Sequence, residues 1–145
     1  MPSFEHTFSL HVPSSTANLA MIRDFVSNIG ARAGLDDAQV MRLTLAVDEA
    51  CANVIEHAYS AEGSMEEVTI RAVLDDDELT FLIVDKGKGF DPSTVEEESL
   101  DELVKKRRSG GLGLRLIRTI MDDVQYTIVP GERNELRMVK RLKKS

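Results

Sequence analysis

The sequence predicts an α/β fold, a two-layer sandwich in which a mixed, mostly antiparallel sheet carries helices on one face. Stretches with a helical apolar period alternate with stretches of period-two or continuous apolar residues. The expected order is β-α-α-β-β-lid-α-β-β, and short turns join most strands, which favours antiparallel neighbours. At 145 residues and 42% apolar composition, residues 1–145 are expected to form one domain.

Charge and hydropathy restrict the class of function. The net charge of −7 argues against general nucleic-acid binding, which needs a positive field. No apolar run approaches the roughly 18 residues of a membrane span. The first residues also lack the basic-then-apolar layout of a signal peptide. We therefore expect a cytoplasmic protein that contacts neither nucleic acid nor membrane directly.

The first strand and the first helix are indicated by a change of period. Apolar side chains recur at alternate positions between residues 4 and 12, as in a half-buried strand, and Pro13 ends the run. Ser14, Ser15 and Thr16 offer N-caps for a helix that runs to about residue 33. Gly34 is its expected stop.

The second helix is predicted to carry a polar stripe. Asp36 and Gln39 form a capping-box pattern at its start, and its apolar period continues to about residue 59. Glu49, Asn53 and Glu56 stand at i, i+4 and i+7, so they share one face, opposite residues that must pack on a hydrophobic layer. The stripe alone fits either a solvated helix face or the wall of a site.

The remaining elements are two hairpins and a helix between them. Residues 68–74 and 78–85 form the first hairpin around an acidic turn, and residues 125–129 and 135–142 form the closing one. Residues 114–124 have a helical apolar period. The basic run 137–144 is interpreted as an edge strand that its charges keep soluble and unpaired. Cys51 is expected to be a buried structural thiol.

Two glycine-bearing segments indicate chemistry beyond packing. Asp85 ends an apolar strand and enters a loop with Gly87 and Gly89, where the backbone can approach a ligand and the carboxylate can accept a hydrogen bond from an exocyclic amine. Gly111 and Gly113 open a helix, whose free N–H groups and dipole favour phosphate. Taken separately, each glycine cluster is equally typical of a helix C-cap followed by a tight turn.

In this order, the segments EACAN (49–53), DKGKGF (85–90) and GLGL (111–114) resemble the three ATP-binding boxes of the GHKL superfamily. The resemblance covers nearly the whole chain and is greatest to the bacterial anti-sigma-factor serine kinases. It implies the GHKL (Bergerat) ATP-binding fold, with ATP and Mg²⁺ as cofactors. It also implies an ATP-dependent protein serine/threonine kinase.

The resemblance further implies a role for each matching position. Glu49 would be the general base, Asn53 would hold Mg²⁺, and Asp85 would bind the adenine amino group. The nucleotide would lie against the backbone of the two glycine segments, at Gly87, Gly89, Gly111, Leu112, Gly113 and Leu114. Phosphoryl transfer does require positioning, a metal to offset phosphate charge and a carboxylate to take a proton, and an amide oxygen suits hard Mg²⁺.

Partners are also implied by this resemblance. Such a kinase phosphorylates a serine of a small antagonist (anti-anti-sigma) protein, holds a sigma factor inactive by binding it, and forms a homodimer. The alternative is a nucleotide-dependent protein-binding switch with little catalysis, in which ATP orders a lid. The basic run 105–108 stands where that lid would close, and it either contacts phosphate or forms a solvated helix face. Asn134 and Glu135 replace the Gly-Thr pair common in the superfamily, so a hydroxyl near adenine is missing.

Overall fold

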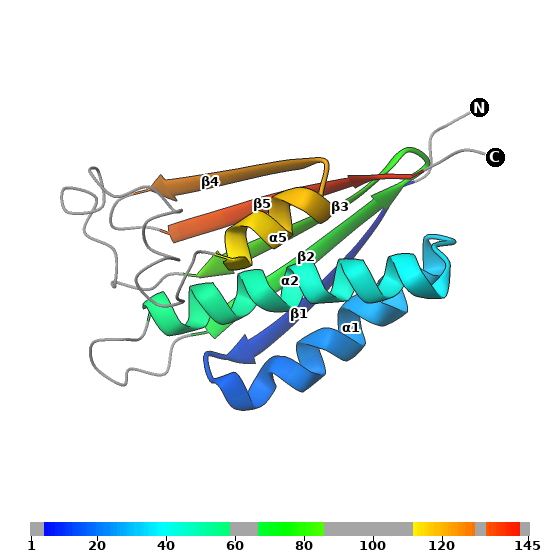
Figure 1. The fold of residues 1–145 in the computed structure, drawn as a ribbon. Helices are drawn as coiled ribbons and strands as arrows, with labels where there is room; N and C mark the ends of the chain where they lie inside the picture. The colour runs from blue at the N-terminus through cyan, green and yellow to red at the C-terminus, as the bar shows by residue number, and fades with distance from the viewer. Residues whose placement is uncertain (1–4, 59–66, 86–111, 130–132, 143–145) are drawn as a thin grey trace.

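The computed structural model describes residues 5–58, 67–85, 112–129 and 133–142. Its strands form one sheet in the order β1-β2-β3-β5-β4, and every pair of neighbouring strands is antiparallel. The helices lie on one face of this sheet (Figure 1). The strands are β1 (Glu5–Pro13), β2 (Glu67–Asp75), β3 (Glu78–Asp85), β4 (Asp123–Val129) and β5 (Arg133–Arg141). The predicted two-layer α/β sandwich is confirmed.

The sheet presents its apolar face to the helices because side chains alternate along each strand. In β3, Leu79, Phe81 and Ile83 are fully buried, and the residues between them are half-buried on the other face. β2 repeats the pattern with Val68, Ile70, Ala72 and Leu74. Asp85 continues the buried series of β3, so a carboxylate occupies a position where the alternation calls for an apolar side chain.

Two long helices and a shorter one cover this face: α1 (Leu19–Arg32), α2 (Asp37–Ala58) and α5 (Leu112–Ile120). A 3-10 turn, η1 (Thr16–Asn18), precedes α1. Each long helix buries an apolar stripe, including Ile22, Val26 and Ile29 in α1 and Leu43, Ala46, Val47, Ala50 and Val54 in α2. The core therefore lies between α1, α2, α5 and the sheet.

Local signals in the sequence set the turn between the long helices. The N–H of Gln39 donates to Oδ1 of Asp36 at 2.8 Å, and the N–H of Asp36 donates to Oε1 of Gln39 at 3.0 Å, which is a capping box at the start of α2. Gly34 has φ of 87°, a left-handed conformation that few other residues adopt. Both signals were predicted from the sequence.

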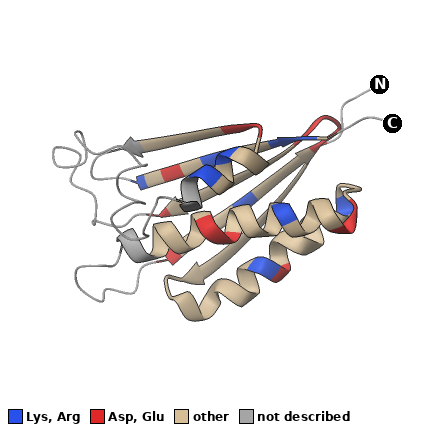
Figure 2. Cartoon of the chain, viewed as in Figure 1, with Lys and Arg blue, Asp and Glu red and all other residues tan. Residues whose placement is uncertain are grey.

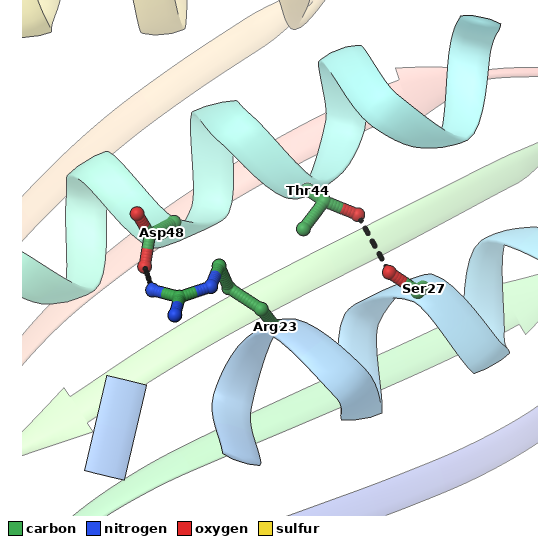
Figure 3. Close-up of polar contacts among 4 residues, drawn as sticks. All are labelled: Arg23, Ser27, Thr44 and Asp48. Carbon is green, nitrogen blue, oxygen red and sulfur yellow. Dashed lines mark hydrogen bonds and ion pairs between the residues drawn. The ribbon is translucent and has the colours of Figure 1, made fainter. Parts of the chain in front are cut away.

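Polar side chains tie α1 to α2 along their exposed edge (Figure 3). Nη1 of Arg23 donates to Oδ1 of Asp48 at 3.0 Å. One turn along each helix, the hydroxyl oxygens of Ser27 and Thr44 are 3.1 Å apart and hydrogen-bonded. These two contacts connect α1 to α2 at successive turns.

Two expectations about the C-terminal part are wrong in detail. The basic run is not an edge strand, because β5 lies between β3 and β4, and the edges are β1 and β4. Its charges lie on both faces: Arg137, on the outward face, pairs with Asp123 at 3.5 Å, and Nζ of Lys140, on the helix-facing side, donates to the carbonyl of Ile120 at 3.0 Å, at the end of α5. The helix ends at Ile120, earlier than predicted, because β4 already begins at Asp123.

Charges of both signs are distributed over the helices and the sheet, and the β2–β3 turn is acidic (Figure 2). Within the described residues, no helix is both long enough and apolar enough to span a membrane.

Candidate functional site

The C-terminal ends of α2 and β3 lie at the same end of the molecule as the first residues of α5 and β5 (Figure 1). The structure thereby gathers at one end Asn53, Asp85 and the start of α5 at Leu112–Leu114. Gly113 opens this helix as predicted. The predicted contact residues Gly87, Gly89 and Gly111, and the basic run 105–108, lie outside the described residues.

Asp85 is held at the end of β3 in a buried, hydrogen-bonded position. Its side chain faces the helices, and only 2% of the residue is exposed. In the sheet register it stands between Val68 of β2 and Asn134 of β5. Nδ2 of Asn134 donates to Oδ1 of Asp85 at 3.2 Å, and Asn134 is itself 3% exposed. A buried charge costs much free energy unless it is paired or hydrogen-bonded, and this amide supplies one such bond.

Tyr126 of β4 adds a third polar group to this end of the sheet. It is opposite Leu136 in the register, two residues from Asn134. Burial raises the pKa of its hydroxyl well above the usual range, and the charge of Asp85 raises that pKa further. Tyr126 therefore stays a neutral phenol near the carboxylate. Tyr126 was not predicted from the sequence, although it shares the inward parity of its strand with Val124.

The polar stripe of α2 forms the other wall. Asn53 is 7% exposed and Glu49 is half-buried, and the Oδ1 and Oε2 atoms of these side chains are shielded from solvent. Such burial favours the wall of a site over a solvated helix face. The neighbouring Ala50 and Val54 pack in the core and anchor the helix. The side chain of Glu56 lies outside the described residues.

These donors fit a nucleotide with a hard metal ion. Among the described residues, no group of three or more His, Cys, Asp and Glu side chains could hold a metal by itself. The carboxylate of Glu49 and the amide oxygen of Asn53 are hard oxygen donors, and Mg²⁺ is commonly held by one or two protein oxygens together with substrate phosphates. At the sheet end, the Asp85 carboxylate can accept from a base amine. The N–H groups of the first turn of α5 suit phosphate.

Comparisons with known proteins agree with this arrangement. The model of the histidine kinase-like ATPase domain family matches residues 12–140. The serine-protein kinase RsbW of Bacillus licheniformis is 33% identical over 123 residues, covering 82% of this chain and 76% of the relative. RsbW of Staphylococcus aureus is 33% identical over 135 residues, covering 90% and 85%. RsbW of Bacillus pumilus is 32% identical over 121 residues, covering 80% and 75%.

These relatives are named as serine-protein kinases, which confirms the kinase expectation drawn from the three boxes. The family match also confirms the nucleotide-binding class of the fold. The buried carboxylate at the end of β3, the buried polar residues of α2 and the family match over most of the chain lead to one assignment. The chain belongs to the histidine kinase-like ATPase family and, within it, to the RsbW serine-protein kinases.

Proposed function

We propose that this protein is an ATP-dependent serine-protein kinase that also acts as an anti-sigma factor. It phosphorylates a serine of an antagonist protein and sequesters a sigma factor. The observation that carries the proposal is the burial of Asn53 and Asp85, two polar residues from different layers, at one end of a chain similar to serine-protein kinases. Core packing alone does not call for an amide and a carboxylate at these two positions.

The sheet end and α5 would bind the nucleotide. Asp85 accepts a hydrogen bond from the exocyclic amine of adenine, because a carboxylate fixed at a strand end is an acceptor only. The N–H groups of the first turn of α5, at Leu112, Gly113 and Leu114, face the phosphates. The backbone of Gly87, Gly89 and Gly111 completes the contact.

The wall formed by α2 would carry the chemistry. Bound ATP supplies the phosphoryl group, and Mg²⁺ offsets the charge of the phosphates. Asn53 would hold the metal through its amide oxygen. Glu49, one turn earlier on the same face, accepts the proton of the attacking serine hydroxyl. Glu49 is half-buried, so part of its side chain is accessible from solvent.

The Glu49→Gln variant tests this assignment. Incubated with Mg-ATP and a candidate antagonist protein, the native chain should form phosphoserine, detected by mass spectrometry. The variant should form it about 100-fold or more slowly, because the amide cannot take a proton. Its affinity for ADP should stay close to that of the native chain, since Gln preserves size and polarity.

Glu5→Gln is the matched control, because Glu5 is an exposed glutamate at the opposite end of the sheet, opposite Asp75 in the register. It should transfer phosphate at the native rate. Undiminished transfer by Glu49→Gln would remove Glu49 from the role of base. Absence of transfer to every antagonist tried, with partner binding that still depends on ATP, would instead establish a nucleotide-dependent switch.

The wider setting is part of the same proposal. We propose that residues 1–145 work as one ATPase domain in the cytoplasm, bind a sigma factor and an antagonist, and contact neither DNA nor membrane. We also propose a homodimer. The exposed edge position of β1 supports it, since an edge strand offers unpaired backbone groups to a second copy.

A further inference from the structure

We propose that Asn134 is a positioning residue for purine recognition: its side-chain amide orients the Asp85 carboxylate, and preference for 6-amino over 6-oxo purines depends on that orientation. The inference rests on the proposed function, in which Asp85 binds the base. Asn134 stands where a Gly-Thr pair is common in the superfamily. In this structure its side-chain amide is hydrogen-bonded to Asp85.

The geometry is that of a directly opposed pair on neighbouring strands. Asp85 and Asn134 are register partners in β3 and β5, and both point to the helix-facing side of the sheet. Their bond of 3.2 Å joins two side chains that are 2% and 3% exposed. Because little water reaches either group, the amide is not easily replaced by solvent as the partner of Oδ1.

The chemistry of the pair fixes the orientation of both groups. An ionised carboxylate only accepts hydrogen bonds, so the amide must present Nδ2 to it and turn its own oxygen away. A carboxylate held at Oδ1 cannot rotate freely about its last bond. Asp85 therefore presents a fixed acceptor edge.

A fixed acceptor edge distinguishes two kinds of purine. A 6-amino group donates to it, whereas a 6-oxo group places a second acceptor against it and leaves a buried carboxylate without that donor. Sites built around a specific hydrogen bond reject an analogue that lacks it, because the protein group is left unpaired. If the carboxylate could rotate freely, binding of the 6-amino group would have to fix its orientation at a cost in free energy. Part of the preference for 6-amino over 6-oxo purines would then be lost.

The test compares the dissociation constants of ADP and inosine diphosphate, measured by calorimetry on the full chain. The two nucleotides differ at the 6-position, which is an amine in ADP and an oxo group in the other, and with it at N1, which is an acceptor in ADP and an N–H in the other. The native protein should prefer ADP. Asn134→Leu should lower this preference about tenfold, chiefly by lowering the affinity for ADP. A tenfold change is the effect of about one hydrogen bond to a charged group. Asn134→Ser should retain part of it, because a hydroxyl also donates.

Gln125→Leu is the control, since Gln125 is an exposed side chain of β4 on the other face of the sheet. It should leave the preference unchanged. If Asn134 had a purely structural role, its variants would lose affinity for both nucleotides equally. An unchanged ratio of the two dissociation constants in Asn134→Leu would therefore overturn the inference. If that variant does not fold, the ratio in Asn134→Ser decides in the same way. Failure of the native chain to bind ADP would overturn the proposed function itself, whereas an ADP preference untouched by Asn134 variants would overturn the positioning role alone.

Discussion

At the residue scale, the candidate site consists of polar side chains in positions where packing alone would place apolar ones. Asp85 and Asn134 stand at the ends of inward-facing series that are otherwise Leu, Phe, Ile and Met. Asn53 is likewise a buried polar residue, on α2. Each such position costs free energy that folding does not recover unless a partner is present. Cys51, by contrast, behaves as a small apolar residue in the centre of α2, fully buried.

Because the thiol of Cys51 is buried, we expect the stability of the protein to fall at alkaline pH. Burial raises its pKa well above the ordinary value of 9.0, and the charge of Asp48 raises it further. The native state therefore keeps the proton at a pH where the unfolded chain has lost it. The free energy of unfolding should fall as pH rises above about 9, by up to about 1.4 kcal/mol per pH unit for this one group.

Urea unfolding of the native chain and of Cys51→Ala between pH 7 and pH 10 measures this effect. The variant should be less stable at pH 7, because it leaves a small cavity, and should lose less stability on going to pH 10. An identical pH dependence in both proteins would show that other groups cause the alkaline loss.

Part of the site could be predicted at this scale and part could not. Glu49, Asn53 and Asp85 were predicted because each stands in a short local pattern, a helical spacing or a strand end beside glycines. Tyr126 was not found, because its proximity to Asp85 arises only when β5 brings β4 to β3. Asn134 was noticed only as a departure from a pattern, and its hydrogen bond to Asp85 needed the strand register. The roles of these residues in catalysis remain proposals.

At the scale of elements, helices and hairpins could be predicted from period and capping, whereas their order in the sheet could not. The first hairpin is found because its strands are joined by a tight turn, in which Oδ1 of Asp75 accepts from the N–H groups of Asp77 and Glu78. The place of β5 was predicted wrongly from its charges: most of them are on the outward parity, Lys140 bonds to the end of α5 on the inner side, and the inward residues Leu136 and Met138 are buried.

The turn between α1 and α2 carries a prediction at the scale of elements. Gly34→Ala should lower the free energy of unfolding by about 1 kcal/mol or more, because alanine is strained at positive φ. A Cβ here would meet no atom within 4 Å, so the loss would come from the backbone alone. Gly34→Asn should lose less, since asparagine tolerates this conformation better. Urea unfolding measures both, and an alanine variant as stable as the native chain would contradict the assignment.

At the scale of the whole molecule, one core lies between the helices and the sheet, and it includes buried residues of α1, α2, α5, β2, β3 and β5. A chain of this size with a shared core is expected to unfold in one step. The proposed dimer adds a second property, because coupling of unfolding to dissociation makes the midpoint depend on concentration.

Thermal unfolding tests these two properties together. Circular dichroism and tyrosine fluorescence should report a single transition with the same midpoint, and this midpoint should rise when the protein concentration is raised. Two separated transitions would argue against one domain. A midpoint independent of concentration, with a monomeric mass in sedimentation equilibrium, would argue against the dimer.

The position of β5 has a consequence for the order in which the protein can be completed during synthesis. β5 follows β4 in the sequence, yet it lies between β4 and β3. On the ribosome, β4 therefore emerges before the strand with which it pairs, and β3 stays an edge of the sheet until β5, with β4 beside it, can pair with it. The hydrogen bond between Asp85 and Asn134 likewise forms only after Asn134 has been synthesised. The end of the molecule that holds Asp85 and Asn134 is therefore expected to be among the last parts of the sheet to form.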